Sequence, residues 1–182
     1  MIGASTGGMK ALQVIAGKLP GDFPLSLCVV QHQYPHGQIF LAKFLENSGP
    51  LPAKVADEKE ALRPGRFYVA PPNYHLLIEE DRTFSLSVDE AVNHSRPSID
   101  VLFETAAEVY GRQLIGVILT GANSDGTLGL KRIAEEGGTT LVQDPATADA
   151  PEMPRAAIEA VAVDFVLPLE EVGACLVDLC GR

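Results

Sequence analysis

The sequence is poor in positive charge and in long apolar runs. Its 14 Lys and Arg are outnumbered by 24 Asp and Glu, and the net charge of -10 argues against a nucleic-acid-binding surface or a polybasic membrane patch. No charge-free apolar run reaches the length of a membrane span, and no signal peptide precedes Gly3. We therefore expect a cytoplasmic protein with no nucleic-acid partner and no membrane insertion.

Cysteine is also scarce. Of the three cysteines, Cys28 lies in an apolar strand pattern, whereas Cys175 and Cys180 lie in the last predicted helix. An odd number of cysteines without metal-ligand spacing is typical of buried thiols in a reducing compartment. We expect no metal ion and no other cofactor.

The chain does contain enough apolar residues for one core. With 182 residues, 46% of them hydrophobic, residues 1–182 are expected to form a single domain. Stretches with strand character alternate with stretches of helical periodicity, which predicts an α/β fold: a doubly wound, mostly parallel sheet flanked by helices, with an inserted β-hairpin region. After a short strand before Ser5, strands are expected at residues 25–30, 67–70, 75–78, 84–88, 114–119, 139–142 and 165–167, and helices at 11–19, 39–45, 99–110, 128–134, 155–162 and 169–179.

Residues 3–8 (Gly-Ala-Ser-Thr-Gly-Gly) form the first special turn. The helical spacing that begins at Ala11 ends at Pro20, so Ser5 lies where a strand passes into a helix N-terminus. Such a turn offers unpaired backbone N–H groups and the positive end of a helix dipole, which stabilise an oxyanion beside the hydroxyl. We interpret it as a nucleophile turn, although a Gly- and Ser-rich turn of this kind, taken alone, more often holds a phosphate or packs tightly than carries a nucleophile. Phosphate binding lacks both Gly-x-Gly-x-x-Gly and a P-loop lysine.

A histidine and an aspartate follow two other predicted strands. His32 comes just after the second strand, and Asp125 lies in the turn at residues 120–126 (Thr-Gly-Ala-Asn-Ser-Asp-Gly). Ligands bind at the carboxyl ends of parallel strands, where three loops can bring Ser5, His32 and Asp125 together. A neutral imidazole can take the serine proton, and a carboxylate fixes the imidazole tautomer and stabilises the cation that forms. These residue types suit acyl transfer.

Each position also has an alternative interpretation. A histidine at a strand end usually bonds to a backbone carbonyl, and an aspartate before a helix can simply cap that helix. The rival residues are His36, His75 and His94 for the base, and Asp144 and Asp149 for the orienting carboxylate.

Five stretches, in order, resemble the catalytic domain of the chemotaxis protein-glutamate methylesterases, the CheB family. Residues 3–8 resemble its nucleophile motif, Gln31-His32 its histidine motif, and residues 119–126 its aspartate motif. Residues 96–103 (Arg-Pro-Ser-Ile-Asp-Val-Leu-Phe) and 153–158 (Met-Pro-Arg-Ala-Ala-Ile) match two further stretches. The resemblance runs nearly end to end, and five motifs in one order are specific.

The resemblance implies a serine esterase. By this similarity Ser5 is the nucleophile, His32 the base and Asp125 its orienting partner. The backbone N–H groups of Thr6 and Ala122 form the oxyanion hole. The implied substrate is a glutamate γ-methyl ester on the cytoplasmic helices of a methylated chemoreceptor, and deamidation of receptor glutamines by the same acyl-enzyme route is an implied second activity. The receiver domain of the family is not found in residues 1–182, so we expect the catalytic domain alone.

Two departures from the family pattern raise a second hypothesis. The family usually has Met-Gly where this chain has Ala122-Asn123, and Asn123 would be strained if its φ is positive. Residues 33–36 replace the usual Met-Pro after the histidine. The favoured hypothesis is an active esterase; the alternative is a catalytically impaired, esterase-like binding or regulatory module in a chemosensory pathway.

Overall fold

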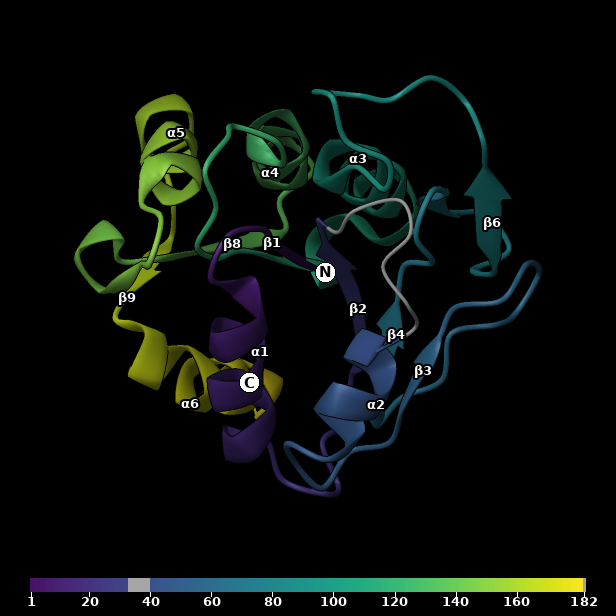
Figure 1. Cartoon of the computed structure of the whole chain (residues 1–182), viewed down its shortest axis with the longest axis horizontal. Helices are drawn as coiled ribbons and strands as arrows, with labels where there is room; N and C mark the ends of the chain where they lie inside the picture. Colours follow the sequence, from purple (N-terminus) through teal and green to yellow (C-terminus); the bar gives the residue numbers. More distant parts are fainter. Residues whose placement is uncertain (33–39, 182) are drawn as a thin grey trace.

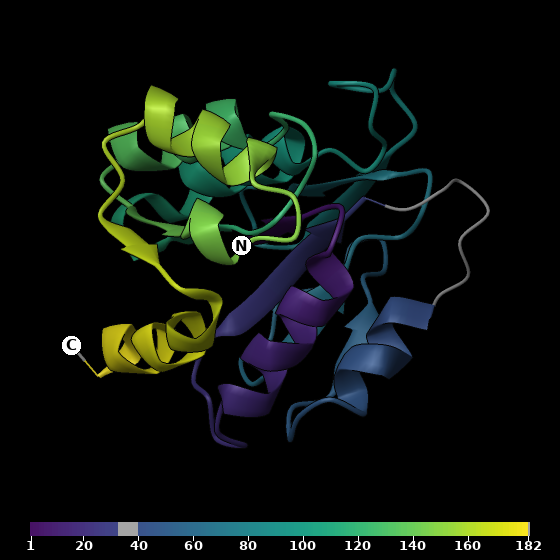
Figure 2. The same ribbon diagram turned by 60° about the vertical axis from the view of Figure 1, so that its left-hand side comes forward.

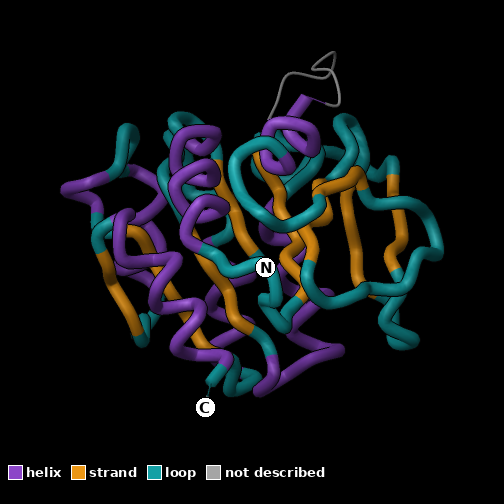
Figure 3. Tube along the Cα trace, turned by 90° about the horizontal axis from the view of Figure 1, so that it is seen from below, coloured by secondary structure: helices purple, strands orange, loops and turns teal. Residues whose placement is uncertain are grey.

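The computed structural model describes residues 1–32 and 40–181 (Figure 1). Seven strands form one sheet in the order β3-β4-β2-β1-β7-β8-β9, and every pairing within it is parallel. Figure 3 shows these strands crossing the molecule with helices around them. Their bounds are β1 Ile2–Ala4, β2 Ser26–Gln31, β3 Ala53–Val55, β4 Arg66–Val69, β7 Ile115–Ile118, β8 Thr139–Gln143 and β9 Phe165–Leu167.

Helices cover both faces of the sheet (Figure 2). One face carries α1 (Gly8–Lys18), α2 (Phe40–Glu46) and α6 (Leu169–Cys180), and the other carries α3 (Ile99–Tyr110), α4 (Thr127–Glu135) and α5 (Glu152–Ala160). Each set closes its own apolar layer, because the central strands are buried on both faces. The hairpin β5 (His75–Ile78) and β6 (Phe84–Ser87) packs on the α3 side, and two 3-10 turns lie at Gly111–Gln113 and Pro145–Thr147.

The predicted fold class is confirmed, with differences at the level of single elements. Strand β3 was not predicted, because its three half-buried residues at the edge of the sheet show no apolar run. Helix α5 begins at Glu152, three residues before the predicted helix 155–162, and Pro154 lies in its first turn. Pro154 is tolerated there because the first four N–H groups of a helix have no intrahelical partner. The predicted helix residue Ile39 lies outside the described residues.

The order of the strands places the carboxyl end of β1 at the centre of the sheet. Strand β1 pairs with β2 on one side and with β7 on the other, and the chain adds β2 and β4 in one direction before it returns to add β7, β8 and β9 in the other. The carboxyl end of β1 is therefore the point at which the strand order reverses, which is where open α/β sheets bind ligands.

The helices that the structure describes are too short for a membrane span. Among the described residues the longest are α3 and α6, with 12 residues each, and none of the described helices has the length and apolar character needed to cross a bilayer.

Candidate active site

Ser5 follows β1 directly, and its backbone is fixed from three sides. Its N–H donates to the Thr120 carbonyl at 2.9 Å, and its own carbonyl accepts from the Gly8 N–H and from Nε2 of Gln31, both at 2.8 Å. Gly7, with φ of 80°, supplies the left-handed conformation that starts α1 immediately after this turn. Among the described residues, no group hydrogen-bonds to the Ser5 hydroxyl, so the side chain is available to a ligand.

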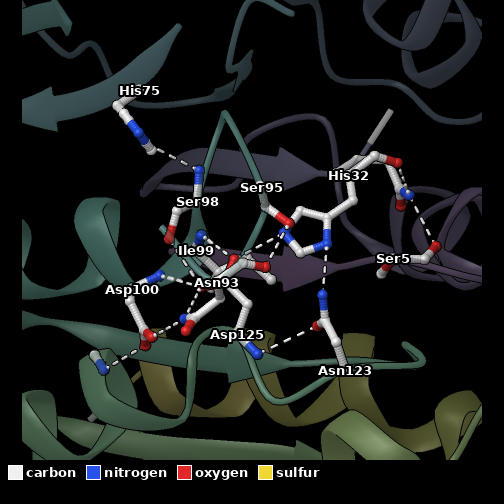
Figure 4. Close-up of polar contacts among 12 residues, drawn as sticks. Ser5, His32, His75, Asn93, Ser95, Ser98, Ile99, Asp100, Asn123 and Asp125 are labelled. Atoms are coloured by element: carbon white, nitrogen blue, oxygen red, sulfur yellow. Dashed lines mark hydrogen bonds and ion pairs between the residues drawn. The ribbon is translucent and has the colours of Figure 1, made fainter. Parts of the chain in front are cut away.

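His32 follows the neighbouring strand β2. Its N–H donates to the Ala4 carbonyl at 3.0 Å, and Gln31 Nε2 bonds to the carbonyls of both Ser5 and His32. The imidazole is 12% exposed, and its Nε2 lies 2.7 Å from Oδ2 of Asp125. Figure 4 shows Ser5 and Asn123 on the side of the ring opposite to that contact. The histidine is thus held between the Ser5 turn and the Asp125 carboxylate.

Asp125 is fully buried and accepts hydrogen bonds at both carboxylate oxygens. Besides the contact with His32, Oδ2 accepts from the Ile99 N–H at 2.7 Å. Oδ1 accepts from the Ser98 hydroxyl at 2.8 Å, from Nδ2 of Asn93 at 3.0 Å and from the Asp100 N–H at 3.3 Å. The carboxylate therefore lies at the N-terminus of α3, where backbone donors and the helix dipole stabilise negative charge.

These donors decide the ionisation state of Asp125. Burial raises the pKa of this carboxyl, but hydrogen bonds from His32, from the Ile99 N–H, from Asn93 and from Ser98 outweigh the burial and hold the pKa below its ordinary value. The site thus contains a carboxylate that stays charged beside the imidazole.

The predicted capping of a helix by Asp125 does occur, but at a different helix. Asp125 precedes α4 in the sequence and yet caps α3. Ser98 stands at the N-cap position of α3, but its hydroxyl bonds to Asp125 and not to the helix. Asp100, near the start of α3, caps α4 in turn: its carboxylate accepts from the Gly129 N–H of α4 at 2.8 Å. The two helices therefore cap each other.

The rival residues that the structure describes make other contacts. His75 is buried in β5, where one ring nitrogen contacts the Glu90 carbonyl and the other accepts from the Ser98 N–H. His94 is exposed on a loop, and His36 lies outside the described residues. Asp144 caps the 3-10 turn that follows it, and Asp149 lies 3.8 Å from Lys10. Of the carboxylates considered, Asp125 is the one that contacts His32.

The N–H groups of Thr6 and Ala122 are available to a ligand. Within the described part of the chain, neither donates to an acceptor. The turn that carries Ala122 is held against the α5 segment, because the Gly121 N–H donates to the Ala150 carbonyl at 2.9 Å and the Gly121 carbonyl accepts from the Met153 N–H at 2.8 Å. A Cβ atom on Gly121 would lie 3.0 Å from Cβ of Ser5, so this turn approaches the serine closely.

Three polar residues that hold the site were assigned no role from the sequence. Gln31 connects the Ser5 and His32 backbones, Asn93 bridges the carboxylates of Asp100 and Asp125, and Asp100 is only 2% exposed. Burial, opposed by the Gly129 N–H and reinforced by the charge of Asp125, raises the pKa of Asp100 to about 6. Gln31 and Asp100 stand within motifs that carry the family resemblance, and that was the only signal for them.

Asn123 does not have the positive φ that would strain it. The described non-glycine residues with positive φ are Lys59, Asn73, Arg82, Asn93 and His94, and they do not include Asn123. The condition for strain is therefore not met, and the asparagine fits the turn without a left-handed conformation.

Comparison with known proteins assigns the chain to a family. The sequence profile of the CheB methylesterase family matches residues 1–176. The chain belongs to the CheB methylesterase family. The family and the methylesterase class of enzyme that the motifs predict are thereby confirmed.

Individual relatives support the same assignment. A Leptospira interrogans protein, provisionally named protein-glutamate methylesterase/protein-glutamine glutaminase, is 54% identical over 179 residues, which cover 98% of this chain and 93% of that protein. A Methanospirillum hungatei protein named protein-glutamate methylesterase/protein-glutamine glutaminase 2 is 40% identical over 182 residues, covering all of this chain and 52% of its own length. The chain thus spans about half the length of several relatives in the CheB family.

A solved structure extends the likeness to three dimensions. The crystal structure of the Thermotoga maritima CheB methylesterase catalytic domain matches with a TM-score of 0.95 at 36% identity, covering 98% of this chain and 96% of that one. The two chains therefore share the fold over nearly their whole length.

Proposed function

We propose that this chain hydrolyses glutamate γ-methyl esters on the cytoplasmic helices of chemoreceptors, with Ser5 as the nucleophile, His32 as the general base and Asp125 as the residue that orients it. The observation that carries the proposal is the 2.7 Å contact between His32 Nε2 and Asp125 Oδ2 beside the Ser5 turn. The names of the relatives support the same ester as substrate.

In the proposed mechanism the two imidazole nitrogens have different tasks. Nε2 carries a hydrogen to the Asp125 carboxylate, so Nδ1 keeps the lone pair that accepts the Ser5 proton. Ser5 Oγ then attacks the ester carbonyl carbon, and the oxyanion that forms accepts from the N–H groups of Thr6 and Ala122. Collapse of the tetrahedral intermediate releases methoxide, which takes the proton from His32 and leaves as methanol.

The second half of the reaction repeats these steps with water. His32 takes a proton from the water, whose oxygen attacks the glutamyl ester on Ser5. The second oxyanion collapses, the Ser5 oxygen recovers its proton from His32, and the receptor glutamate is released. Replacing the methyl ester by a glutamine side chain gives deamidation with ammonia as the first product, and the relatives' second name, protein-glutamine glutaminase, supports this second activity.

The test is methanol release from a methylated receptor fragment by wild type and by Ser5→Ala. We expect release to fall to background in Ser5→Ala, because the acyl-enzyme cannot form. Ser26→Ala is the matched control, since Ser26 lies at the opposite end of β2 from His32 and should keep full activity. Circular dichroism checks that all three proteins are folded.

Two outcomes would contradict the proposal. Release by folded Ser5→Ala would exclude Ser5 as the nucleophile. Absence of release from folded wild type, together with absence of covalent labelling of Ser5 by a serine-directed phosphonate, would leave the binding module as the remaining hypothesis.

A further inference from the structure

Asn123 lies on the side of His32 that the proposed mechanism uses. Its carboxamide Oδ1 accepts from the Asp125 N–H at 3.2 Å, and its Nδ2 is 3.5 Å from His32 Nδ1 (Figure 4). The side chain thus spans from the backbone of one proposed catalytic residue to the ring of another.

The two ends of this carboxamide are distinguishable by chemistry. A backbone N–H can only donate, so the end of the carboxamide that faces the Asp125 N–H must be the oxygen. The amino end therefore faces the imidazole. Because an amide amino group only donates, the ring nitrogen opposite it must be the one without a hydrogen.

The contact on the other side of the ring selects the same tautomer. Nε2 lies 2.7 Å from the Asp125 carboxylate, which only accepts, so Nε2 carries the hydrogen. Asn123 and Asp125 together leave the lone pair on Nδ1. At 3.5 Å the amide contact is longer than an ordinary hydrogen bond, so it can give way when the Ser5 hydroxyl takes its place.

We propose that Asn123 is a positioning residue that holds the resting imidazole of His32 in the neutral tautomer with its lone pair on Nδ1. The inference rests on the proposed function only for its consequence, that this lone pair accepts the Ser5 proton. Two carboxylates act on the ring besides Asn123: Asp125 in contact, and Asp100 linked to Asp125 through Asn93. The variants below leave both in place.

The first test determines the tautomer of the His32 imidazole in the absence of substrate. A long-range proton–nitrogen NMR spectrum of the histidine rings, with His32 identified by its loss in His32→Gln, distinguishes a bare ring nitrogen from a protonated one. We expect wild type at neutral pH to show a bare Nδ1 and a protonated Nε2. In Asn123→Asp we expect both nitrogens to carry a proton, because a carboxylate at each end stabilises the imidazolium. A protonated Nδ1 in folded wild type at neutral pH would overturn the proposal.

The second test reads the consequence for catalysis. In Asn123→Asp we expect kcat to fall at least tenfold at pH 7 with KM little changed, and to recover as the pH rises, because the base must first lose its extra proton. In Asn123→Ala we expect a loss of about threefold, which corresponds to one weak hydrogen bond. Ser124→Ala, an exposed change in the same turn, is the control and should behave as wild type.

The two tests separate this inference from the proposed function. An Asn123→Asp protein whose ring spectrum and pH profile both match wild type would overturn the role of Asn123. The spectrum decides the tautomer even if the chain releases no methanol, so failure of the esterase proposal leaves this inference testable.

Discussion

At the scale of single residues, the site depends on a carboxylate with five donors around it. Asp125 accepts from one imidazole, one hydroxyl, one carboxamide and two backbone N–H groups. Its charge is stabilised locally, because these donors outweigh the cost of burial. Asp100 is linked to Asp125 through Asn93, which donates to both carboxylates. Asp100 accepts fewer hydrogen bonds, and burial in the folded protein disfavours its charged form.

The raised pKa of Asp100 predicts that the stability of the folded protein depends on pH. Burial raises its pKa to about 6 from the ordinary value of 3.8, so the folded protein binds the proton more tightly than the unfolded chain. This contribution is fully present below pH ~4 and is lost as the pH rises through about 6, on the order of 2 kcal/mol in total. We expect urea unfolding from pH 4 to 7 to show wild type losing stability relative to Asp100→Asn.

The comparison reports on Asp100 together with its charge coupling to Asp125, because the two proteins share every other titrating side chain. Asp149→Asn is a suitable control, since Asp149 has a half-exposed side chain and its Lys10 contact is long. Parallel stability curves for wild type and Asp100→Asn across this pH range would contradict the prediction.

At the scale of elements, the turn after β7 packs closely between Ser5 and α5, and Gly121 is the residue at the point of contact. A Cβ at this position would lie 2.6 Å from Met153 Cε and 3.0 Å from Ser5 Cβ. We expect Gly121→Ala to lower the free energy of unfolding by about 1–2 kcal/mol through overpacking. Because a small displacement of reacting groups costs much rate, we also expect methanol release to fall by about tenfold or more.

A second substitution distinguishes the two contacts. Adding Met153→Ala removes the flexible neighbour but leaves a cavity, because Met153 is fully buried, so the stability should fall further. The rate should stay low, since the Ser5 contact remains. Gly17→Ala in α1 is the control: its nearest neighbour would be the Ser48 carbonyl at 3.4 Å, and an alanine there should raise helix stability by about 0.5–1 kcal/mol. Full activity of Gly121→Ala would contradict the close fit.

The elements also mark how far the sequence could predict the structure. Apolar runs and helical periodicity predicted the α/β order and placed Ser5, His32 and Asp125 at strand ends. Strand β3 was not predicted, because three half-buried residues at an edge of the sheet have no periodicity. The hydrogen bond from Asn93 to Asp125 was not predicted either, because it joins two loops 32 residues apart and no local sequence pattern encodes such a contact.

At the scale of the whole molecule, the net charge of -10 acts on any substrate before contact. The field of exposed charges is screened over about 8 Å at physiological ionic strength and reaches further in dilute salt. We expect a methyl-ester peptide flanked by Lys to have kcat/KM about tenfold above that of a matched peptide flanked by Glu at low ionic strength, through faster association. The difference should shrink to about twofold in concentrated salt.

The measurement is kcat/KM for both peptides over a salt series, with kcat as the internal control, because steering changes association and not chemistry. An acidic peptide that is hydrolysed equally well in dilute salt would show that local contacts at the site override the net charge.

The mutual capping of α3 and α4 has a consequence for how relatives of this chain are compared. Asp125 would still be needed to cap α3 in a protein that had lost its esterase activity, and Asp100 would still be needed for α4. Selection for folding alone would then preserve the aspartate while the serine and the histidine drift. An aspartate at this position in a distant sequence is therefore evidence of the fold, and only the residues corresponding to Ser5 and His32, the proposed nucleophile and base, bear on whether the proposed chemistry has been kept.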